Sequence, residues 1–396
     1  MGLNGDERAA PLSGAGTMLR MIRDGEAVTR ADLARRTGLA RSTVSHRIEA
    51  LLASRLVYEA GASVSSGGRR PTVLAFNEDA GVILAADLGA THTRVAVSNL
   101  GATLLGELTF DMDIAEGPEP VLTRTEECFA ALLAEIGRTP ADVRGIGLGV
   151  PGPVSFTGGQ PVKPPIMPGW DGFSIPSWLA GPYDAPVLVD NDVNVMAFGE
   201  QRIHWRSVEH LLFVKVGTGI GCGIIASGRV HRGPQGAAGD IGHIHLSGHD
   251  EVICWCGNVG CLEAVAGGRA LARRLAQAGH DVQDSRGVVR LAASGNTDAI
   301  RMVRESGRRL GEVLASCVSF FNPAVIVLGG DLAETHDQIL AGVREVVFQR
   351  SLPLATRDLR IVRTRLGDRA GVIGAALMVI EHVLEPDAVD RAINVP

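Results

Sequence analysis

The sequence predicts an α/β protein of two parts: an N-terminal winged helix-turn-helix domain, residues 1–76, and a two-lobed α/β body, residues 77–396. Two helical patterns around a glycine turn, followed by two short strand patterns, predict the first part. In the body, apolar strands run into glycine-containing turns in two separate stretches, which indicates two related lobes. A length of 396 residues and a hydrophobic content of 45% are enough for more than one core.

The N-terminal part has two short helices around a glycine turn. Thr29 and Asp32 are spaced as a capping box, and Gly38 is placed to end the helix over residues 30–37 in the left-handed conformation. The next helix, over residues 41–55, has an apolar stripe on one side. Its other side carries small hydroxyl groups and basic groups, namely Arg41, Ser42, Thr43, Ser45, His46 and Arg47. This pattern predicts a recognition helix that contacts DNA.

Charge and the following strands support that prediction. Residues 56–76 are typical of two strands whose connecting loop, with Arg69 and Arg70, forms a wing. Residues 1–76 contain 11 arginines and 7 acidic residues, a balance of +4, so the other residues carry −10 of the net charge of −6. A basic module on an acidic body indicates that only the module binds nucleic acid. The alternative is a helical dimerisation hairpin whose polar face is solvated.

A cluster of candidate metal ligands is the strongest local pattern of the body. Cys254, Cys256 and Cys261 lie within eight residues, and His243 lies eleven residues before the first of them. Three thiolates and one imidazole are the ligand set of a closed, tetrahedral, structural Zn²⁺ site. The alternative is a group of buried, reduced cysteines without metal. The spacing and the convergence of four suitable ligands favour zinc.

Three glycine-containing turns follow apolar strands, and glycine lets backbone N–H groups approach an anion such as phosphate closely. Their candidate residues are Asp87, Gly89 and Thr91 in the first turn, Gly217, Thr218 and Gly219 in the second, and Gly329 and Gly330 in the third. A further strand ends at Asn191 and Asp192. These two side chains either cap the helix that follows or contact a ligand in a cleft at the strand end.

Two motifs of the body carry a family resemblance. The run G-x-x-G-D-I-G-H ends at His243, and the run C-x-C-G-x-x-G-C-L-E ends at Glu263. Together with the order of the glycine turns, they resemble the ROK family of repressors, open reading frames and sugar kinases over residues 77–385. The resemblance implies an actin/hexokinase-like body in which ligands bind between two lobes.

The resemblance also implies roles for individual residues. A monosaccharide is expected to contact Asn191, Asp192, Asp240, His243 and Glu263, and Asp192 matches the general base of the kinases. His243 would bind zinc through one ring nitrogen and face the ligand with the other. If phosphotransfer is retained, ATP and Mg²⁺ would bind at Asp87 and the glycine turns. The proline-rich loop at residues 168–170 is expected to close the pocket.

Two departures from the kinase pattern bear on activity. Asp240 stands where the family has glutamate, and its shorter side chain reaches less far toward a sugar hydroxyl. Ala90 stands where active kinases have a second glycine, and its methyl group disfavours a positive φ and crowds a phosphate. The sequence therefore leaves open whether phosphotransfer is retained.

The expected function is that of a sugar-responsive transcriptional regulator, a repressor, that binds operator DNA as a homodimer or homotetramer and responds to a monosaccharide or sugar derivative. The alternatives are an ATP-dependent sugar kinase, alone or combined with DNA binding, and a scaffold for a partner protein. No apolar run is long enough to span a membrane, and residues 1–16 have no apolar core. A cytoplasmic protein without a membrane partner is therefore expected.

Overall fold

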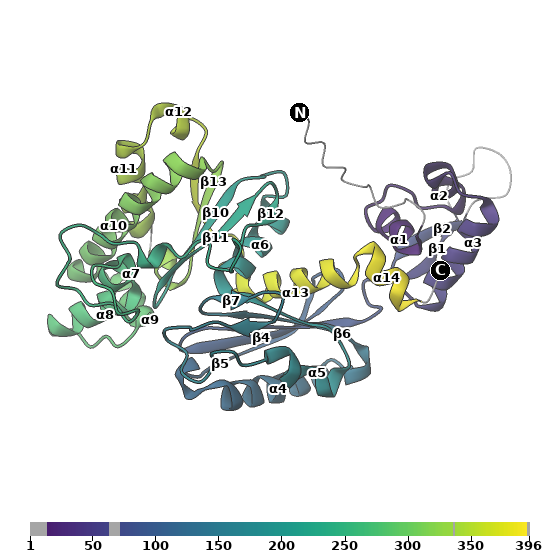
Figure 1. Ribbon diagram of the computed structural model, residues 1–396, viewed down its shortest axis with the longest axis horizontal. Helices are drawn as coiled ribbons and strands as arrows, with labels where there is room; N and C mark the ends of the chain where they lie inside the picture. The colour runs from purple at the N-terminus through teal and green to yellow at the C-terminus, as the bar shows by residue number, and fades with distance from the viewer. Residues whose placement is uncertain (1–13, 63–71, 336, 394–396) are drawn as a thin grey trace.

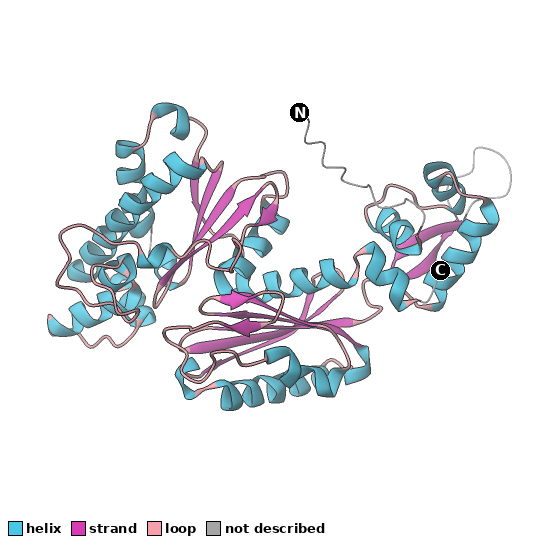
Figure 2. Cartoon of the chain, viewed as in Figure 1, coloured by secondary structure: helices cyan, strands magenta, loops and turns pink. Residues whose placement is uncertain are grey.

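The computed structural model describes residues 14–62, 72–335 and 337–393. These residues form three bodies: an N-terminal unit of helices and a hairpin, and two α/β lobes that we call lobe I and lobe II (Figure 1). Each lobe consists of one sheet with helices packed on it, as Figure 2 shows. The predicted fold class, a two-lobed α/β body behind a winged helix-turn-helix, is confirmed.

The N-terminal unit packs three helices against an antiparallel hairpin. Its elements are α1 (Ala15–Arg23), α2 (Arg30–Thr37), α3 (Arg41–Ala53), β1 (Val57–Ala62) and β2 (Thr72–Phe76). Gly38 ends α2 with a φ of 71°, as predicted. The capping box is only half formed, because the Asp32 carboxylate accepts from the Thr29 hydroxyl and not from the Thr29 backbone. The recognition helix is shorter than predicted, since Arg55 has a φ of 61° and cannot continue a helix.

Lobe I is a five-stranded sheet of order β5-β4-β3-β6-β9. Its strands are β3 (Val82–Leu88), β4 (His92–Asn99), β5 (Leu104–Asp111), β6 (Val143–Val150) and β9 (Val187–Asn191). The first three in this order pair antiparallel, whereas β3, β6 and β9 are parallel. The outer face is covered by α4 (Pro118–Glu135) and α5 (Ile175–Tyr183), and a small hairpin of β7 (Val154–Ser155) and β8 (Gln160–Pro161) lies beside the sheet.

Lobe II repeats this topology in a sheet of order β12-β11-β10-β13-β14. Its strands are β10 (Leu211–Val216), β11 (Ile220–Ala226), β12 (Arg229–Val230), β13 (Val325–Gly329) and β14 (Arg360–Arg363). Again two strand pairs are antiparallel and two are parallel, in the same positions. The helices of this lobe are α7 (Leu262–Ala266), α8 (Gly268–Gln277), α9 (Ser285–Ala293), α10 (Thr297–Phe321), α11 (Gln338–Arg350) and α12 (Pro353–Thr356). The matching sheets confirm two related lobes.

Two helices connect the lobes. The helix α6 (Asp192–His204) begins where β9 ends in lobe I and packs on β10 and β11 of lobe II. The helix α13 (Ala370–Val383) crosses α6 at close range, because a side chain at Gly374 would collide with the backbone of Val195. Glycine at this crossing lets the two helix backbones touch. The cleft between the lobes is therefore bordered by two helices that contact both.

The C-terminal helix α14 (Pro386–Ala392) leads from the body back to the N-terminal unit, as Figure 1 shows. It packs on α1, and the Gly16 amide donates to Asp390 Oδ1 at 2.8 Å. One apolar cluster includes residues of α1, α3, α13 and α14. Within the described residues, no helix has the length and apolarity to cross a membrane.

Candidate functional site

A cavity of about 700 Å³ lies between the two lobes, where the strands of both sheets end. Lobe I contributes Asp87 at the end of β3 and Asn191 at the end of β9. Lobe II contributes Gly217 after β10 and Asp331 after β13. Ligands of α/β sheets bind at such strand ends, and the volume suits a small molecule.

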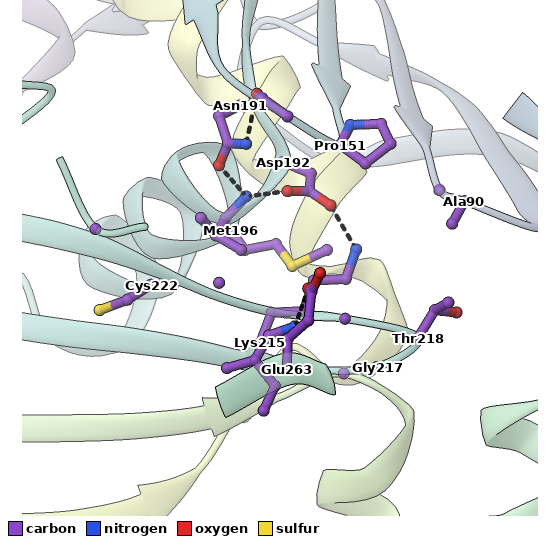
Figure 3. A pocket seen from close by; sticks show the side chains of 18 of the residues that line it. Ala90, Pro151, Asn191, Asp192, Met196, Lys215, Gly217, Thr218, Cys222 and Glu263 are labelled. Carbon is purple, nitrogen blue, oxygen red and sulfur yellow. Dashed lines mark hydrogen bonds and ion pairs between the residues drawn. The ribbon is translucent and has the colours of Figure 1, made fainter. Parts of the chain in front are cut away.

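The five residues predicted to contact a sugar all line this cavity: Asn191, Asp192, Asp240, His243 and Glu263. The amide of Asn191 is also structural, since its oxygen caps α6 and its nitrogen donates to the Gly152 carbonyl at 2.7 Å. Glu263 accepts from the Ile220 amide at 3.2 Å, and burial raises the pKa of the Glu263 carboxyl. Asn191, Asp192 and Glu263 lie around one space in Figure 3.

Asp192 is paired with Lys215, a residue that the sequence did not bring to attention. Lys215 Nζ donates to Asp192 Oδ2 at 2.6 Å, and the backbone amide of Val193 donates to Oδ1 at 2.8 Å (Figure 3). Burial would lower the pKa of Lys215, but the nearby carboxylates Asp192, Asp87 and Asp331 outweigh it and raise that pKa above its usual range. Lys215 therefore stays charged and both oxygens of Asp192 have a donor.

Asp87 lies next to this pair at the base of the cleft. Burial raises the pKa of Asp87 to about 6, with Lys215 opposing and Asp192 adding to the shift. Its Oδ1 atom is buried without a hydrogen-bond partner in the structure. A carboxylate atom without a donor has room for a cation, a water or a ligand hydroxyl.

The predicted phosphate residues are only partly brought together. Gly89, Gly217, Thr218, Gly219 and Gly330 line the cavity with Asp87. Thr91 does not: its side chain is exposed, and the next residue, His92, lines the cavity. Gly329 also lies outside the cavity. The ring of Phe213 packs against it, at the position where a Cβ atom would stand. The structure therefore does not bring Thr91 and Gly329 to the cavity with the other predicted residues.

His92 is a second cleft residue that the sequence did not indicate. Burial, followed by the charge of Arg286, lowers the pKa of His92 to about 4. The imidazole is therefore neutral at neutral pH. Its Nδ1 atom is buried without a partner, which leaves it available to a ligand.

Two further expectations about the cleft need correction. Ala90 has no positive φ, so its methyl group does not strain the turn, although it does line the cavity. Trp170 does not close the pocket: it is fully buried in the core of lobe I and donates its indole N–H to the Ile114 carbonyl at 3.0 Å. The cavity-facing part of this loop is earlier, at Lys163, Pro165 and Ile166.

His243, Cys254, Cys256 and Cys261 form a cluster suited to a metal ion. Their ligand atoms all lie within 4.8 Å of one another. His243 Nδ1 is 3.6 Å from Cys254 Sγ, and Cys256 Sγ is 3.7 Å from Cys261 Sγ. A tetrahedral site with metal–sulfur bonds of about 2.3 Å separates its sulfur atoms by roughly 3.8 Å, so the donors fit a metal of this kind.

Asp240 lies on the far side of the His243 ring. Its Oδ1 atom is 3.8 Å from His243 Nε2, the nitrogen that points away from the cysteines. A carboxylate beside a metal-ligating histidine orients the ring and increases its basicity. The shorter side chain at this position is thus placed to act on His243 as well as on a ligand.

The polar side of α3 forms the candidate nucleic-acid interface. Arg41, Ser42 and His46 are exposed, whereas Thr43, Ser45 and Arg47 are half-buried. The N-terminus of α3 has no side-chain cap, so its backbone N–H groups are free for phosphate. The wing residues Arg69 and Arg70 lie outside the described residues. Arg30 of α2 bridges α3 and β1 through Glu49 and Glu59, each at 2.9 Å.

Comparisons with known proteins agree with this geometry. The model described as ROK family matches residues 83–382, and the model described as winged helix-turn-helix DNA-binding matches residues 18–57. A putative xylose repressor of Caldicellulosiruptor sp. (strain Rt8B.4) is 32% identical over 390 residues, which cover 94% of this chain and 96% of that protein.

Two solved structures align with different portions of the chain. A ROK family transcriptional regulator, described as a homologue of the E. coli MLC protein, aligns with a TM-score of 0.78 and 26% identity over 96% of this chain and 98% of its own. A ROK family glucokinase from Streptomyces griseus, in complex with glucose and AMPPNP, aligns with a TM-score of 0.67 and 26% identity over 75% of this chain and 99% of its own. The chain belongs to the ROK family and carries a winged helix-turn-helix ahead of the ROK body.

Proposed function

We propose that the protein is a transcriptional repressor whose binding to operator DNA changes when a monosaccharide binds in the cleft. The observation that carries this proposal is the presence in one chain of a helix with an open polar face, α3, and of a carboxylate-lined cavity of about 700 Å³. The similarity to a repressor and to a regulator structure along almost the whole chain supports it. The DNA module is proposed to be residues 1–76, and the ligand-binding body residues 77–396.

The DNA partner is a pseudo-palindromic operator, and the protein binds it as a homodimer. One N-terminal unit offers a single recognition helix, which reads one half-site. Arg41, Ser42 and His46 are exposed at the start of α3, where recognition helices meet base edges. Arg69 and Arg70 on the wing would add phosphate or minor-groove contacts.

The effector is a neutral monosaccharide. Carboxylate and amide groups of Asn191, Asp192 and Glu263 line the cavity, and they are the acceptors and donors that sugar hydroxyls need. The imidazole of His92 is neutral and adds a further uncharged partner. Because a similar protein is named a xylose repressor, a pentose is the first ligand to test.

The metal is Zn²⁺, held by His243, Cys254, Cys256 and Cys261 in a structural site. The ligand set and the 3.6 Å and 3.7 Å separations support this assignment. The role of the metal is to fix the loop that carries His243 and to set the tautomer of its ring, so that Nε2 faces Asp240 and the cleft.

The second candidate is a sugar kinase that uses ATP and Mg²⁺. The position of Asp192 beside the glycine turn of Gly217 and Gly219 favours it, as does the similarity to a glucokinase over 75% of the chain. Its catalytic base would be Asp192. This activity would come in addition to DNA binding, because the N-terminal unit lies outside that similarity.

A gel-shift assay tests the main proposal. The DNA is the region upstream of the protein's own gene, and the protein is the zinc-loaded full chain, with and without a panel of pentoses, hexoses and amino sugars. The expected result is a specific shift that one sugar abolishes or strengthens. An ATP-consumption assay with the same panel tests the kinase. A protein that binds no operator, or whose operator binding no sugar changes, would contradict the proposed function.

A further inference from the structure

The two lysines of this chain lie in the same cleft. Of 38 lysine and arginine residues, 36 are arginine, and only Lys163 and Lys215 are lysine. Both line the cavity between the lobes. All other basic side chains with a permanent charge are arginine. Lysine differs from arginine because it carries a compact ammonium group with three donors in place of a planar guanidinium.

Lys215 places its ammonium group among three carboxylates. It donates to Asp192 at 2.6 Å. A methyl group added at Gly149 would lie 3.6 Å from Asp87 Oδ1 and 3.7 Å from Asp192 Cβ, so these two side chains are neighbours. A methyl group at Gly217 would lie 3.8 Å from Lys215 Cε and 3.9 Å from Asp331 Oδ2. The carboxylates of Asp87 and Asp331 therefore lie close to the Lys215–Asp192 pair, and of the three only Asp192 forms an ion pair with Lys215.

Three neighbouring carboxylates form a site for a cation. Mg²⁺ in phosphotransfer sites is held by one or two carboxylates together with the phosphates of the substrate. In this chain the cation is supplied by the protein itself. The ammonium group offsets one of up to three negative charges, because it forms an ion pair with Asp192.

We propose that Lys215, paired with Asp192 and close to Asp87 and Asp331, is a built-in cation that takes the place of Mg²⁺ and thereby makes the cleft a sugar-binding site that does not transfer phosphate. This inference rests on the proposed sensing function and deepens it. Asp192, held between Lys215 Nζ and the Val193 amide, accepts a hydrogen bond from a ligand hydroxyl but does not remove its proton.

The ion pair also explains why Asp192 can be kept without kinase activity. The Asp192 oxygen that accepts from the ammonium group at 2.6 Å is occupied by that hydrogen bond and is not free to take a proton from a ligand hydroxyl. Its orientation toward the cavity is fixed by two donors, which favours recognition of a single hydroxyl. The same residue thus serves binding in place of proton transfer.

The test is divalent-cation binding in charge-removal variants. Zinc-loaded full-length protein is titrated with Mn²⁺ alone, and bound Mn²⁺ is counted from the loss of the free-ion EPR signal. Lys215→Met, and Lys215→Gln as a second variant in case the first does not fold, are each expected to bind one Mn²⁺ at least about tenfold more tightly than the wild type. Adding Asp192→Asn to either variant should abolish that gain.

Lys163→Met is the matched control, because Lys163 is an exposed lysine of the same cavity. It should leave Mn²⁺ binding as in the wild type. Folded Lys215 variants that bind Mn²⁺ no better than this control would overturn the proposal. Wild-type protein that phosphorylates a sugar in the presence of Mg²⁺ would do the same. A failure of sugar-responsive operator binding would instead contradict the proposed function and leave the Mn²⁺ result intact.

Discussion

At the residue scale, Asp192 is the side chain expected to accept a hydrogen bond from a bound sugar or, in a kinase, to remove a proton from it. Its carboxylate is 7% exposed and has donors on both oxygens, so only a ligand that matches the remaining lone pairs can use it. Asp192→Asn should weaken sugar binding by on the order of 1.5–3 kcal/mol, because a charge-assisted hydrogen bond is lost and Lys215 is left unpaired. Titration followed by tryptophan fluorescence measures this, since Trp255 lines the same cavity.

The control for that experiment lies outside the cleft. Asp184→Asn changes the same chemical group at an exposed position after α5. It should leave the sugar affinity as in the wild type. An Asp192→Asn protein that binds sugar as tightly as this control would show that the carboxylate makes no contact with the ligand.

Asp87 gives the cleft a pH dependence of stability. Its pKa is raised to about 6 in the folded protein by burial, above the unfolded value near 4. The Asp87 carboxyl therefore keeps its proton to a higher pH in the folded protein than in the unfolded protein. The free energy of unfolding falls as the pH rises from about 4 through about 6. Asp87→Asn removes this loss, and we expect the variant to gain up to about 3 kcal/mol relative to the wild type across that window. Thermal unfolding of both proteins at matched pH values measures the difference; a pH-independent difference would contradict it.

Residues of the site differ in how readily a sequence reveals them. The four metal ligands were predicted together because their order and spacing are specific, and the structure brings them within 4.8 Å. Lys215 was missed because it stands in an apolar strand, where one basic residue has no motif around it. Its partner Asp192 lies 23 residues away, and only the pairing of the lobes joins them.

At the scale of elements, the loop from residue 244 to 261 contains no helix or strand. Its backbone is held by turn hydrogen bonds and by two isolated bridges, His245 with Cys261 and Ile253 with Val259. If zinc holds this loop, its binding energy is folding energy. Cys256→Ser should therefore reduce zinc to less than about 0.3 per chain and lower the unfolding midpoint by on the order of 5 °C or more. Elemental analysis and calorimetry measure the two effects.

Cys317→Ser is the matched control for the metal loop. Cys317 is half-buried in α10, away from the cluster, so the change from sulfur to oxygen is the same but no metal ligand is lost. The control should keep one zinc per chain. Equal metal content in the two variants would contradict the assignment of Cys256 as a ligand.

The recognition helix is the second element with a separable role. Arg41 is exposed at the first residue of α3, and Arg47 is half-buried further along the helix. Arg41→Ala or Arg47→Ala should cost about 1–3 kcal/mol of operator affinity if the side chain reads a base, and should reduce the salt slope if it contacts phosphate. Arg124→Ala, an exposed arginine on α4 of the body, is the control. Salt-dependent binding isotherms that do not distinguish α3 variants from this control would exclude α3 as the interface.

Elements were easier to predict than their contacts. The helices and strands of the N-terminal unit, and most strands of the two sheets, follow from capping residues, apolar periodicity and glycine turns, all of which are local. The C-terminal helices α13 and α14 were not identified. Their function depends on distant partners: Asp390 contacts Gly16 across 374 residues, and no local pattern encodes that contact.

At the scale of the whole molecule, α13 and α14 join the cleft to the DNA-binding unit. Gly367 and Asp368, just before α13, line the cavity, and a side chain at Gly371 would collide with the Asp87 carboxylate. A change in the position of Asp87 therefore acts on the start of α13. At the other end, α14 packs on α1 so closely that a side chain at Gly16 would meet the Pro386 carbonyl. A continuous path of close packing along α13 and α14 therefore joins the cleft to α1.

This arrangement predicts a variant that binds both ligands without coupling them. Asp390→Ala removes the acceptor of the Gly16 amide, so α1 is no longer held to α14 by this bond. Operator affinity without sugar and sugar affinity without DNA should stay close to the wild type, whereas the effect of sugar on operator binding should fall toward none, because coupling is a free energy separate from either affinity. Asp387→Ala, on an exposed position of the same helix, is the control and should respond as the wild type does. An Asp390→Ala protein that retains the full sugar response would mean that the signal reaches the N-terminal unit by another route, such as the strand connection from β2 to β3.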